Sequence, residues 1–351
     1  MSLNRDSSKT RRVSCMAGGH DPLSQRNLRG RTMAKVFGIH ESIDRRLKTA
    51  VKKHGLNIDK AAARVLGDAV LSVWHYGMGP APIVLKGGDL FPQTLRETDD
   101  VDILTIRRYS NLEIQNGFKV IAPLLEGRGI SLEFLSPEPQ EIDTGYGDPV
   151  FRYKFRGKVG GVRANSHIDM TLARGPHAIP PVLIDSCLPS FVDGVDPLRI
   201  KTVPLVSVAA EKWLAVLTQS PTDYRVKHLS DLFMLADVAK LDLACVAQEI
   251  ERVARHRGMP LACCTPTPDA LRWPSLALRE QSWLKLSENR RHGRSMFQVF
   301  IDVNAMWSDL HAQLCAKVGK DFRSAGYEPM HLDRLLAGRG YEPRLKPAGA
   351  A

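Results

Sequence analysis

Two aspartates separated by one residue, Asp100 and Asp102, are the residues whose type and spacing point most directly to chemistry. The apolar residues around them predict a strand over 101–106. Because strand side chains alternate between faces, both carboxylates project side by side. Carboxylates this close repel each other unless a cation lies between them, and hard oxygen ligands suit Mg²⁺ beside a phosphate. The pair therefore predicts a metal site for a phosphorylated substrate.

A glycine turn comes shortly before this pair. The apolar run 83–85 predicts a short buried strand, and Gly87-Gly88 predicts a sharp turn from that strand into a helix. Glycines let backbone N–H groups approach an anion, and a helix N-terminus adds partial positive charge. With Arg96 and Thr98 following, the combination favours a nucleotide site. The alternative, a solvated turn, fits less well because carboxylates otherwise weaken a strand.

A third carboxylate, Asp169, lies among apolar residues in the strand predicted over 166–172. An unpaired buried carboxylate is costly, so Asp169 needs a partner. If its strand lies beside the strand of the aspartate pair, it completes a cluster of three carboxylates. The alternative is a salt bridge to Arg163 or Arg174.

The composition is that of a globular protein without a membrane segment. The chain has 351 residues, 43% of them hydrophobic, which is enough for two domains or one elaborated domain. It contains no run of about 18 apolar residues that would span a membrane, and its basic N-terminus lacks a signal-peptide core. The six cysteines show no Cys-x-x-Cys spacing, which argues against zinc and fits a reducing cytoplasm.

The net charge of +11 and pI near 9.4 predict a polyanionic partner, nucleic acid first. The alternative is that the charge only keeps the protein soluble.

The segment 151–156 alternates strictly between aromatic and basic residues, which predicts a strand with a basic outer face. That face either contacts nucleic-acid phosphates or protects an edge strand from aggregation.

The pattern along the chain divides it into four parts. Residues 1–38 lack apolar periodicity and are expected to form a disordered basic extension. Residues 39–203 combine two N-terminal helices with strands, 204–338 are helical throughout, and 339–351 form a basic tail. The fold class is therefore α/β (α+β), with the clearest helix over 297–318.

Taken together, these motifs resemble the AbiEii/AbiGii family of nucleotidyltransferase toxins over roughly residues 80–240. The family sequence reads Leu-Lys-Gly-Gly-Ser/Thr, then Arg-x-Ser/Thr-x-Asp-Ile-Asp, and a later helix carries Ala-Glu-Lys. The matching residues here are Leu85, Lys86, Gly87, Gly88, Arg96, Thr98, Asp100, Asp102, Ala210, Glu211, Lys212, Asp231 and Leu232. Two positions depart: Asp89 replaces a hydroxyl expected to contact phosphate, and His228 replaces an expected acidic residue.

The resemblance implies a polymerase-beta-like nucleotidyltransferase core with a mixed sheet, followed by a helical C-terminal domain. It implies a Mg²⁺-dependent toxin of a toxin–antitoxin or phage-defence system, which transfers a nucleotide from an NTP to an RNA acceptor such as tRNA. A cognate antitoxin is the expected protein partner. The rivals are a catalytically degenerate nucleotide or RNA sensor, which Asp89 favours, and transfer to a protein hydroxyl.

Roles follow for the matched residues. Asp100, Asp102 and Asp169 are expected to hold Mg²⁺, with Asp169 also helping to deprotonate the acceptor hydroxyl. Lys212 is expected to neutralise charge that develops during transfer; its alternative is a surface pair within its own helix. The remaining nucleotide-binding residues are expected to be Lys86, Gly87, Gly88, Asp89, Arg96 and Thr98.

Overall fold

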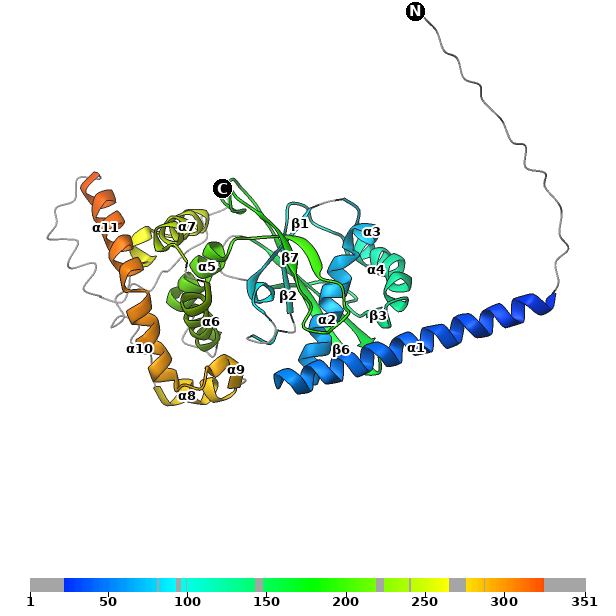
Figure 1. The fold of residues 1–351 in the computed structure, drawn as a ribbon. Helices are drawn as coiled ribbons and strands as arrows, with labels where there is room; N and C mark the ends of the chain where they lie inside the picture. The colour runs from blue at the N-terminus through cyan, green and yellow to red at the C-terminus, as the bar shows by residue number, and fades with distance from the viewer. Residues whose placement is uncertain are drawn as a thin grey trace, which may run out of the picture.

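The fold is described from a computed structural model, which covers residues 22–80, 82–92, 96–98, 100–142, 148–218, 224–239, 241–264, 276–286 and 288–324 (Figure 1). Within these residues, one sheet holds the strands β1 (Ile83–Lys86), β2 (Asp100–Thr105), β3 (Ile130–Phe134), β4 (Gln140–Ile142), β5 (Val150–Val159), β6 (Val162–Leu172), β7 (Ile184–Leu188) and β8 (Leu198–Thr202). The strand order is β3-β5-β6-β2-β1-β8-β7, and β4 also pairs with β5. The pairs β2–β6 and β1–β8 are parallel and the others antiparallel, so the expected mixed sheet is confirmed.

Helices from the N-terminal half cover one face of this sheet. They are α1 (Pro22–His54), α2 (Ile58–Ser72), α3 (Trp74–Met78) and α4 (Asn111–Glu126). Asn57 begins α2 by accepting two backbone N–H groups, and Ser110 forms a capping box with Glu113 at the start of α4. The core beneath them includes Leu66 of α2 and Ile103 of β2.

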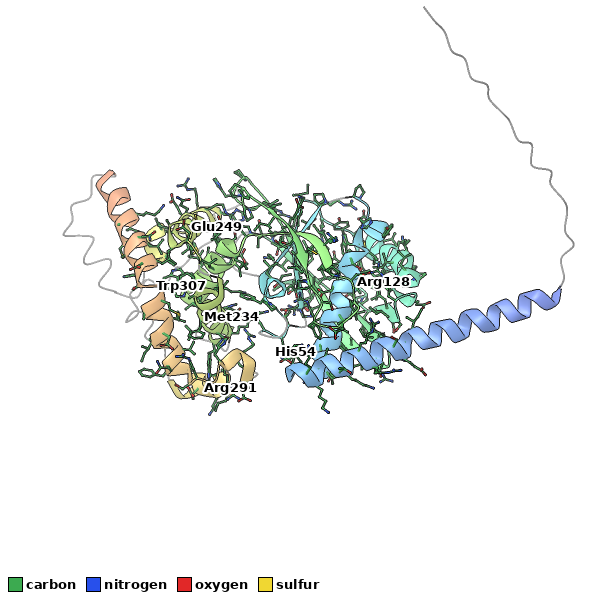
Figure 2. All side chains as sticks on the ribbon, viewed as in Figure 1. His54, Arg128, Met234, Glu249, Arg291 and Trp307 are labelled. Carbon is green, nitrogen blue, oxygen red and sulfur yellow. The ribbon has the colours of Figure 1, made fainter. Side chains whose placement is uncertain are left out.

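The C-terminal half is helical and packs on the opposite face. Its helices are α5 (Leu205–Thr218), α6 (Tyr224–Ala239), α7 (Leu243–His256), α8 (Leu276–Leu284), α9 (Glu288–Arg291), α10 (Met296–Met306) and α11 (Ser308–Ser324). Their core takes in Val84 and Leu104, which are partners across β1 and β2. The alternate residues Leu85 and Ile103 enter the first core, so the sheet separates two hydrophobic cores. Figure 2 shows Met234 among the side chains of the C-terminal core.

Three elements differ from the sequence expectations. The helix α1 begins at Pro22, inside the segment 1–38 that was expected to lack regular structure; residues 1–21 lie outside the described residues. Leu, Arg, Gln, Met and Ala all favour helix there, even without an apolar stripe. The helix expected over 297–318 is two helices that meet at Trp307, whose buried indole donates to Leu232 O at 3.3 Å.

Periodicity carries across that break because both helices pack on the same core, so the sequence pattern does not reveal it. The segment 136–148 carries Pro, Gly and acidic residues, which favour a loop, yet it contains β4, because pairing with β5 satisfies the backbone groups of that strand. None of the helices in the described part of the chain combines the length and apolar character that crossing a membrane requires.

A close contact between two glycines joins α3 to α4. A Cβ added at Gly77 would lie 2.5 Å from the backbone oxygen of Gly117. Backbone cannot move aside as a flexible side chain can, so we expect Gly77→Ala to lower the free energy of unfolding by about 1–3 kcal/mol. Urea unfolding followed by circular dichroism measures this change.

The matched control is Gly38→Ala on α1, where the added Cβ meets nothing within 4 Å. Alanine favours helix over glycine, so this variant is expected to be at least as stable as wild type. Equal midpoints for the two variants would contradict the packing account.

Candidate active site

Strand pairing brings three sequence-predicted residues side by side. In the parallel pair β2–β6, Asp102 lies opposite Asp169, and in the antiparallel pair β1–β2, Lys86 lies opposite Asp102. Directly opposed residues share a face of the sheet, and Asp100, two residues before Asp102, lies on the same face. The expectation that the strand of Asp169 lies beside the strand of the aspartate pair is confirmed. These side chains project from the face on which the helical half packs.

The two aspartates of β2 differ in electrostatic environment. Burial would raise the pKa of Asp100, but the hydrogen bond from the Thr98 hydroxyl and the charge of Arg96 outweigh it and lower that pKa to about 2. Burial and the negative charge of Asp100 raise the pKa of Asp102 to about 6, against the pull of Lys86. One carboxylate is therefore firmly ionised and repels the other. A divalent cation between them would relieve this repulsion, so the donor set fits Mg²⁺.

The glycine turn lies directly against these groups. Gly87 adopts a φ of 72°, which favours glycine, and a Cβ there would overlap the Asp102 carboxylate. A Cβ at Gly88 would overlap the Arg96 guanidinium. The helix expected after the turn is a single 3-10 turn, Gly87–Leu90, so it contributes close backbone approach without the dipole of a full helix.

Asp89, within the same turn, is held by α2. Its side chain is 2% exposed, and Arg64 contacts it twice, with Nη1 to Oδ1 at 2.7 Å and Nη2 to the backbone oxygen at 2.8 Å. Burial raises the pKa of Asp89, while Arg64 opposes this shift. The Asp89 carboxylate is therefore paired with a cation from the structural core, and it anchors the turn to α2.

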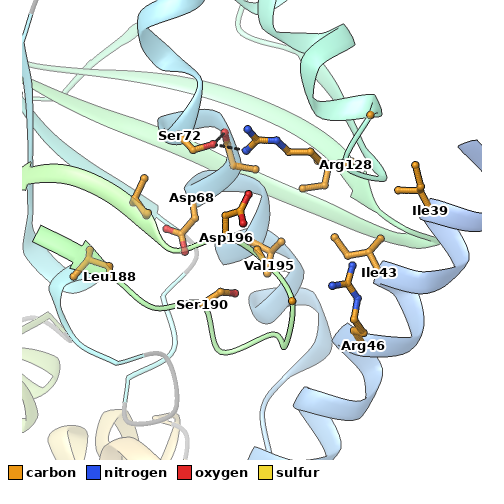
Figure 3. A pocket seen from close by; sticks show the side chains of 16 residues that line it. Ile39, Ile43, Arg46, Asp68, Ser72, Arg128, Leu188, Ser190, Val195 and Asp196 are labelled. Carbon is orange, nitrogen blue, oxygen red and sulfur yellow. Dashed lines mark hydrogen bonds between the residues drawn. The ribbon is translucent and has the colours of Figure 1, made fainter.

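Arg64 also binds Asp68, which lines a cavity beside α1 and α2 (Figure 3). Its Nε donates to Asp68 at 2.9 Å, and Asp68 lines this cavity of about 250 Å³. The remaining wall is largely apolar, with Arg46 and Arg128 at its rim, and Arg128 donates to Ser72 at 2.9 Å. None of the sequence-predicted site residues lines it, so this cavity is separate from the aspartate site.

On the helical side, Asp231 of α6 gathers three cations. Its side chain is 0% exposed, and Oδ1 lies 2.8 Å from Arg96 Nε and 2.9 Å from Arg290 Nη2, while Oδ2 lies 3.7 Å from Lys212 Nζ. Burial would raise the pKa of Asp231, but these cations lower it strongly. Burial lowers the pKa of Lys212, against the attraction of Asp231. Arg96 and Lys212 are thus fixed between α6 and the aspartates rather than left on a surface.

Sequence reasoning assigned no role to Asp231 or Lys227, although both belong to this site. The charge of Lys227 helps to lower the pKa of Asp100. These residues are four apart on α6 and share a face, a spacing visible in the sequence. Arg290 of α9 also belongs to this group: it pairs with Asp231 and donates to Lys227 O at 3.1 Å. His228, which replaces the acidic residue of the family sequence, is buried. Burial lowers its pKa well below 6.5, so its imidazole is neutral.

Asp169 is held by a partner that the sequence analysis did not name. Arg152 of β5 donates from Nε to Oδ1 at 2.7 Å and from Nη2 to Oδ2 at 2.6 Å, and neither Arg163 nor Arg174 is its ion-pair partner. Within the described ranges, no group of three or more His, Cys, Asp or Glu side chains is arranged to hold a metal ion. The geometry therefore offers two carboxylates to a cation, with the Arg152–Asp169 pair beside them.

Comparison with known proteins adds the family. The model of the nucleotidyl transferase AbiEii toxin, of type IV toxin–antitoxin systems, matches residues 80–306. Among solved structures, MenT4, a nucleotidyltransferase toxin from Mycobacterium tuberculosis, is 16% identical, with 83% of this chain and 98% of that chain covered and a TM-score of 0.44. JHP933 from Helicobacter pylori is 15% identical, with 75% and 93% covered and a TM-score of 0.39. No curated protein sequence matches this chain.

The matched span begins just before β1 and ends with α10, so it contains the glycine turn, the aspartate pair, Asp169 and the cation cluster around Asp231. It covers more than half of the chain, and the family expected from the sequence motifs is confirmed. The chain therefore belongs to the AbiEii family of nucleotidyltransferase toxins of type IV toxin–antitoxin systems.

Proposed function

We propose that this toxin is a Mg²⁺-dependent enzyme that transfers a nucleotide from a nucleoside triphosphate to an RNA acceptor such as tRNA. The observation that carries the proposal is the group of cations near two half-buried aspartates. Lys86 lies opposite Asp102, the charges of Arg96 and Lys227 lower the pKa of Asp100, and the charge of Lys212 acts in the same direction on the pKa of Asp102. Carboxylates that bind a metal, surrounded by cations that bind phosphate, are the composition that a metal–triphosphate complex requires.

Asp100 and Asp102 are the residues that would hold Mg²⁺, because the negative charge of one raises the pKa of the other when no cation separates them. Two carboxylates suffice for this ion, since it commonly completes its coordination with water and substrate phosphates. Bound Mg²⁺ supplies charge neutralisation at the α-phosphate and at the departing pyrophosphate. Thr98, which donates to the Asp100 carboxylate, fixes its orientation.

The cations have distinct positions in the transfer. Lys86 and Lys212 both lower the pKa of Asp102 by their charge, so their ammonium groups would also attract the phosphates of a triphosphate bound there. Arg96 is locked by Asp231 and stacks 5.7 Å from the Phe91 ring, which fixes its guanidinium in advance. Cations held in place before the reaction stabilise the charge that develops on the phosphates without reorganisation.

In the reaction itself, a bond forms between the acceptor hydroxyl oxygen and the α-phosphorus, and the bond to the β-phosphate bridging oxygen breaks. Pyrophosphate leaves, and the hydroxyl proton passes to a base. Asp169, which lies next to Asp102 in the sheet, would accept the hydrogen bond of that hydroxyl. Its oxygens already accept from Arg152, which leaves lone pairs for the hydroxyl and fixes their direction.

RNA is favoured as the acceptor by the net charge of +11. The sensor alternative drew its support from Asp89, whose carboxylate is paired with Arg64 instead of standing unpaired at a phosphate. The type IV toxin–antitoxin family implies a cognate antitoxin that opposes the toxin's activity.

The direct test incubates purified protein with Mg²⁺, each α-labelled triphosphate in turn, and total tRNA. Wild type is expected to label RNA with at least one triphosphate. Asp100→Asn and Asp102→Asn are each expected to lower the rate by more than about 100-fold, because each removes a negative ligand of the metal. Gel electrophoresis before and after ribonuclease treatment measures the label in RNA.

The matched control is Asp185→Asn on β7, an aspartate that is 84% exposed and should leave the rate unchanged. Label that survives ribonuclease but not protease would identify a protein acceptor. Triphosphate binding without any transfer would instead support the sensor alternative.

A second prediction concerns Asp231. Asp231→Asn leaves Arg96, Lys212 and Arg290 buried together around a neutral amide, so we expect the free energy of unfolding to fall by about 3–5 kcal/mol. Urea unfolding measures this loss.

Removing one of the cations should restore part of the free energy of unfolding that Asp231→Asn loses. The double variant Asp231→Asn/Arg290→Gln is expected to be more stable than Asp231→Asn alone, because fewer like charges then share the cluster. A double variant whose two losses simply add would show that Asp231 does not act by pairing these cations.

A further inference from the structure

The sheet face that carries the aspartates becomes more exposed to solvent along β5 and β6. Near the site, Asp169 and Arg152 have side chains that are 12% and 30% exposed. Farther along β5, Lys154, Arg156 and Lys158 are exposed, and Arg156 reaches 54%. The helical half therefore covers the reactive end of this face, while the distal part of β5 and β6 is open to solvent.

The open part carries cations in register. Across β5 and β6, Lys154 lies opposite His167, and Lys158 lies opposite Arg163. Arg156 pairs with Glu133 of the neighbouring strand β3, on a surface where both side chains are about half exposed. For Lys154, Lys158 and Arg163, the described residues include no carboxylate within ion-pair distance. We call Arg152, Lys154, Arg156, Lys158 and Arg163 the basic half-sheet.

The position of β5 and β6 decides between the two interpretations of this charge. Four of the five residues of the basic half-sheet lie on β5, which is inside the sheet, with β3 and β4 on one side and β6 on the other. Charges that protect a sheet from aggregation belong on edge strands, where backbone groups are unpaired. Arg152, Lys154, Arg156 and Lys158 therefore protect no edge, and their charge calls for another explanation.

The opposite face holds this surface rigid. Phe151, Tyr153 and Phe155 alternate with the basic residues and are buried in the first core, and Tyr153 donates its hydroxyl to Tyr109 O at 2.9 Å. The backbone of β5 therefore cannot turn its cations away. Alternate residues of a strand stand roughly 6.7 Å apart, so the row from Arg152 to Lys158 extends for about 20 Å from the aspartate site.

We propose that the basic half-sheet binds the phosphates of a single RNA strand and leads its 3′ end to Asp169 and the aspartate pair. This inference rests on the proposed function and names the surface through which the acceptor is recognised. The exposed positions along β5 hold cations alone, and such a row suits a phosphate backbone rather than a protein surface, which offers apolar contacts as well. Binding would depend on salt and little on sequence.

The test uses the full chain and the triple variant Lys154→Gln/Lys158→Gln/Arg163→Gln. The matched control, Arg45→Gln/Lys52→Gln/Lys53→Gln, removes the same charge from exposed positions on α1. Fluorescence anisotropy with a labelled 12-nucleotide single-stranded RNA, from 50 to 200 mM salt, gives Kd and its salt dependence. The half-sheet variant is expected to raise Kd more than about tenfold and to reduce the slope of log K against log salt by about 2.

Triphosphate binding, measured separately with Mg²⁺ and no RNA, is expected to change less than about twofold in either variant, since neither touches the cations of the aspartate site. In the transfer assay, the half-sheet variant should raise the KM for RNA and leave kcat near the wild-type value.

RNA affinity that is unchanged in the half-sheet variant, or lost equally in the α1 control, would overturn the inference even if wild type transfers nucleotides normally. If RNA affinity falls only in the half-sheet variant while wild type transfers nucleotides to no RNA, the basic half-sheet is supported as an RNA-binding surface and the proposed function is overturned. A protein acceptor whose binding needs the same three residues would overturn the choice of RNA.

Discussion

Two half-buried carboxylates two residues apart are the constraint around which this molecule is built. Asp100 and Asp102 repel each other in a low-dielectric site, and their burial costs free energy unless cations and hydrogen-bond donors surround them. The compensation comes from several parts of the chain: Thr98 from the preceding loop, Lys86 from β1, and Lys227 from α6. The glycines of the turn follow from the same constraint, because a side chain at Gly87 would occupy the space of the Asp102 carboxylate.

On the helical side, Asp231 offsets the repulsion among the cations of the site. Arg96 and Lys212 must stay near the aspartates and ready for phosphate, yet cations crowded together repel one another. A fully buried carboxylate between them, with Arg290 as a third partner, holds the group together before any substrate arrives. The same pairing joins the loop before β2 to α6 and to α9. The interaction that organises the site therefore also helps to bind the sheet to the helical half.

The sequence was informative where chemistry depends on local spacing. The pattern around Asp100 and Asp102 predicted a strand with both carboxylates on one face, and the apolar strand around Asp169 required a partner beside it. Partners that depend on tertiary packing were missed: Arg64 for Asp89, Arg152 for Asp169 and Arg290 for Asp231. These three pairs join residues that are 17 to 59 positions apart in the sequence, and the pair of Arg96 and Asp231 spans 135 positions. Hydrophobic periodicity carries no information about pairings over such distances.

Strand order turns one sheet face into two surfaces with different tasks. Because β2 lies in the middle of the sheet, the helical half can cover β1 and β2, where Val84 and Leu104 join its core, and enclose the aspartates in a low-dielectric setting. The strands β5 and β6 continue the same face beyond that cover. An enclosed end strengthens electrostatic interactions with a triphosphate, whereas an open end admits a long polyanion whose charge must be met in water. Asp169 and Arg152 stand at the border, one belonging to each strand, so the salt bridge between them fixes the register in which the two surfaces meet.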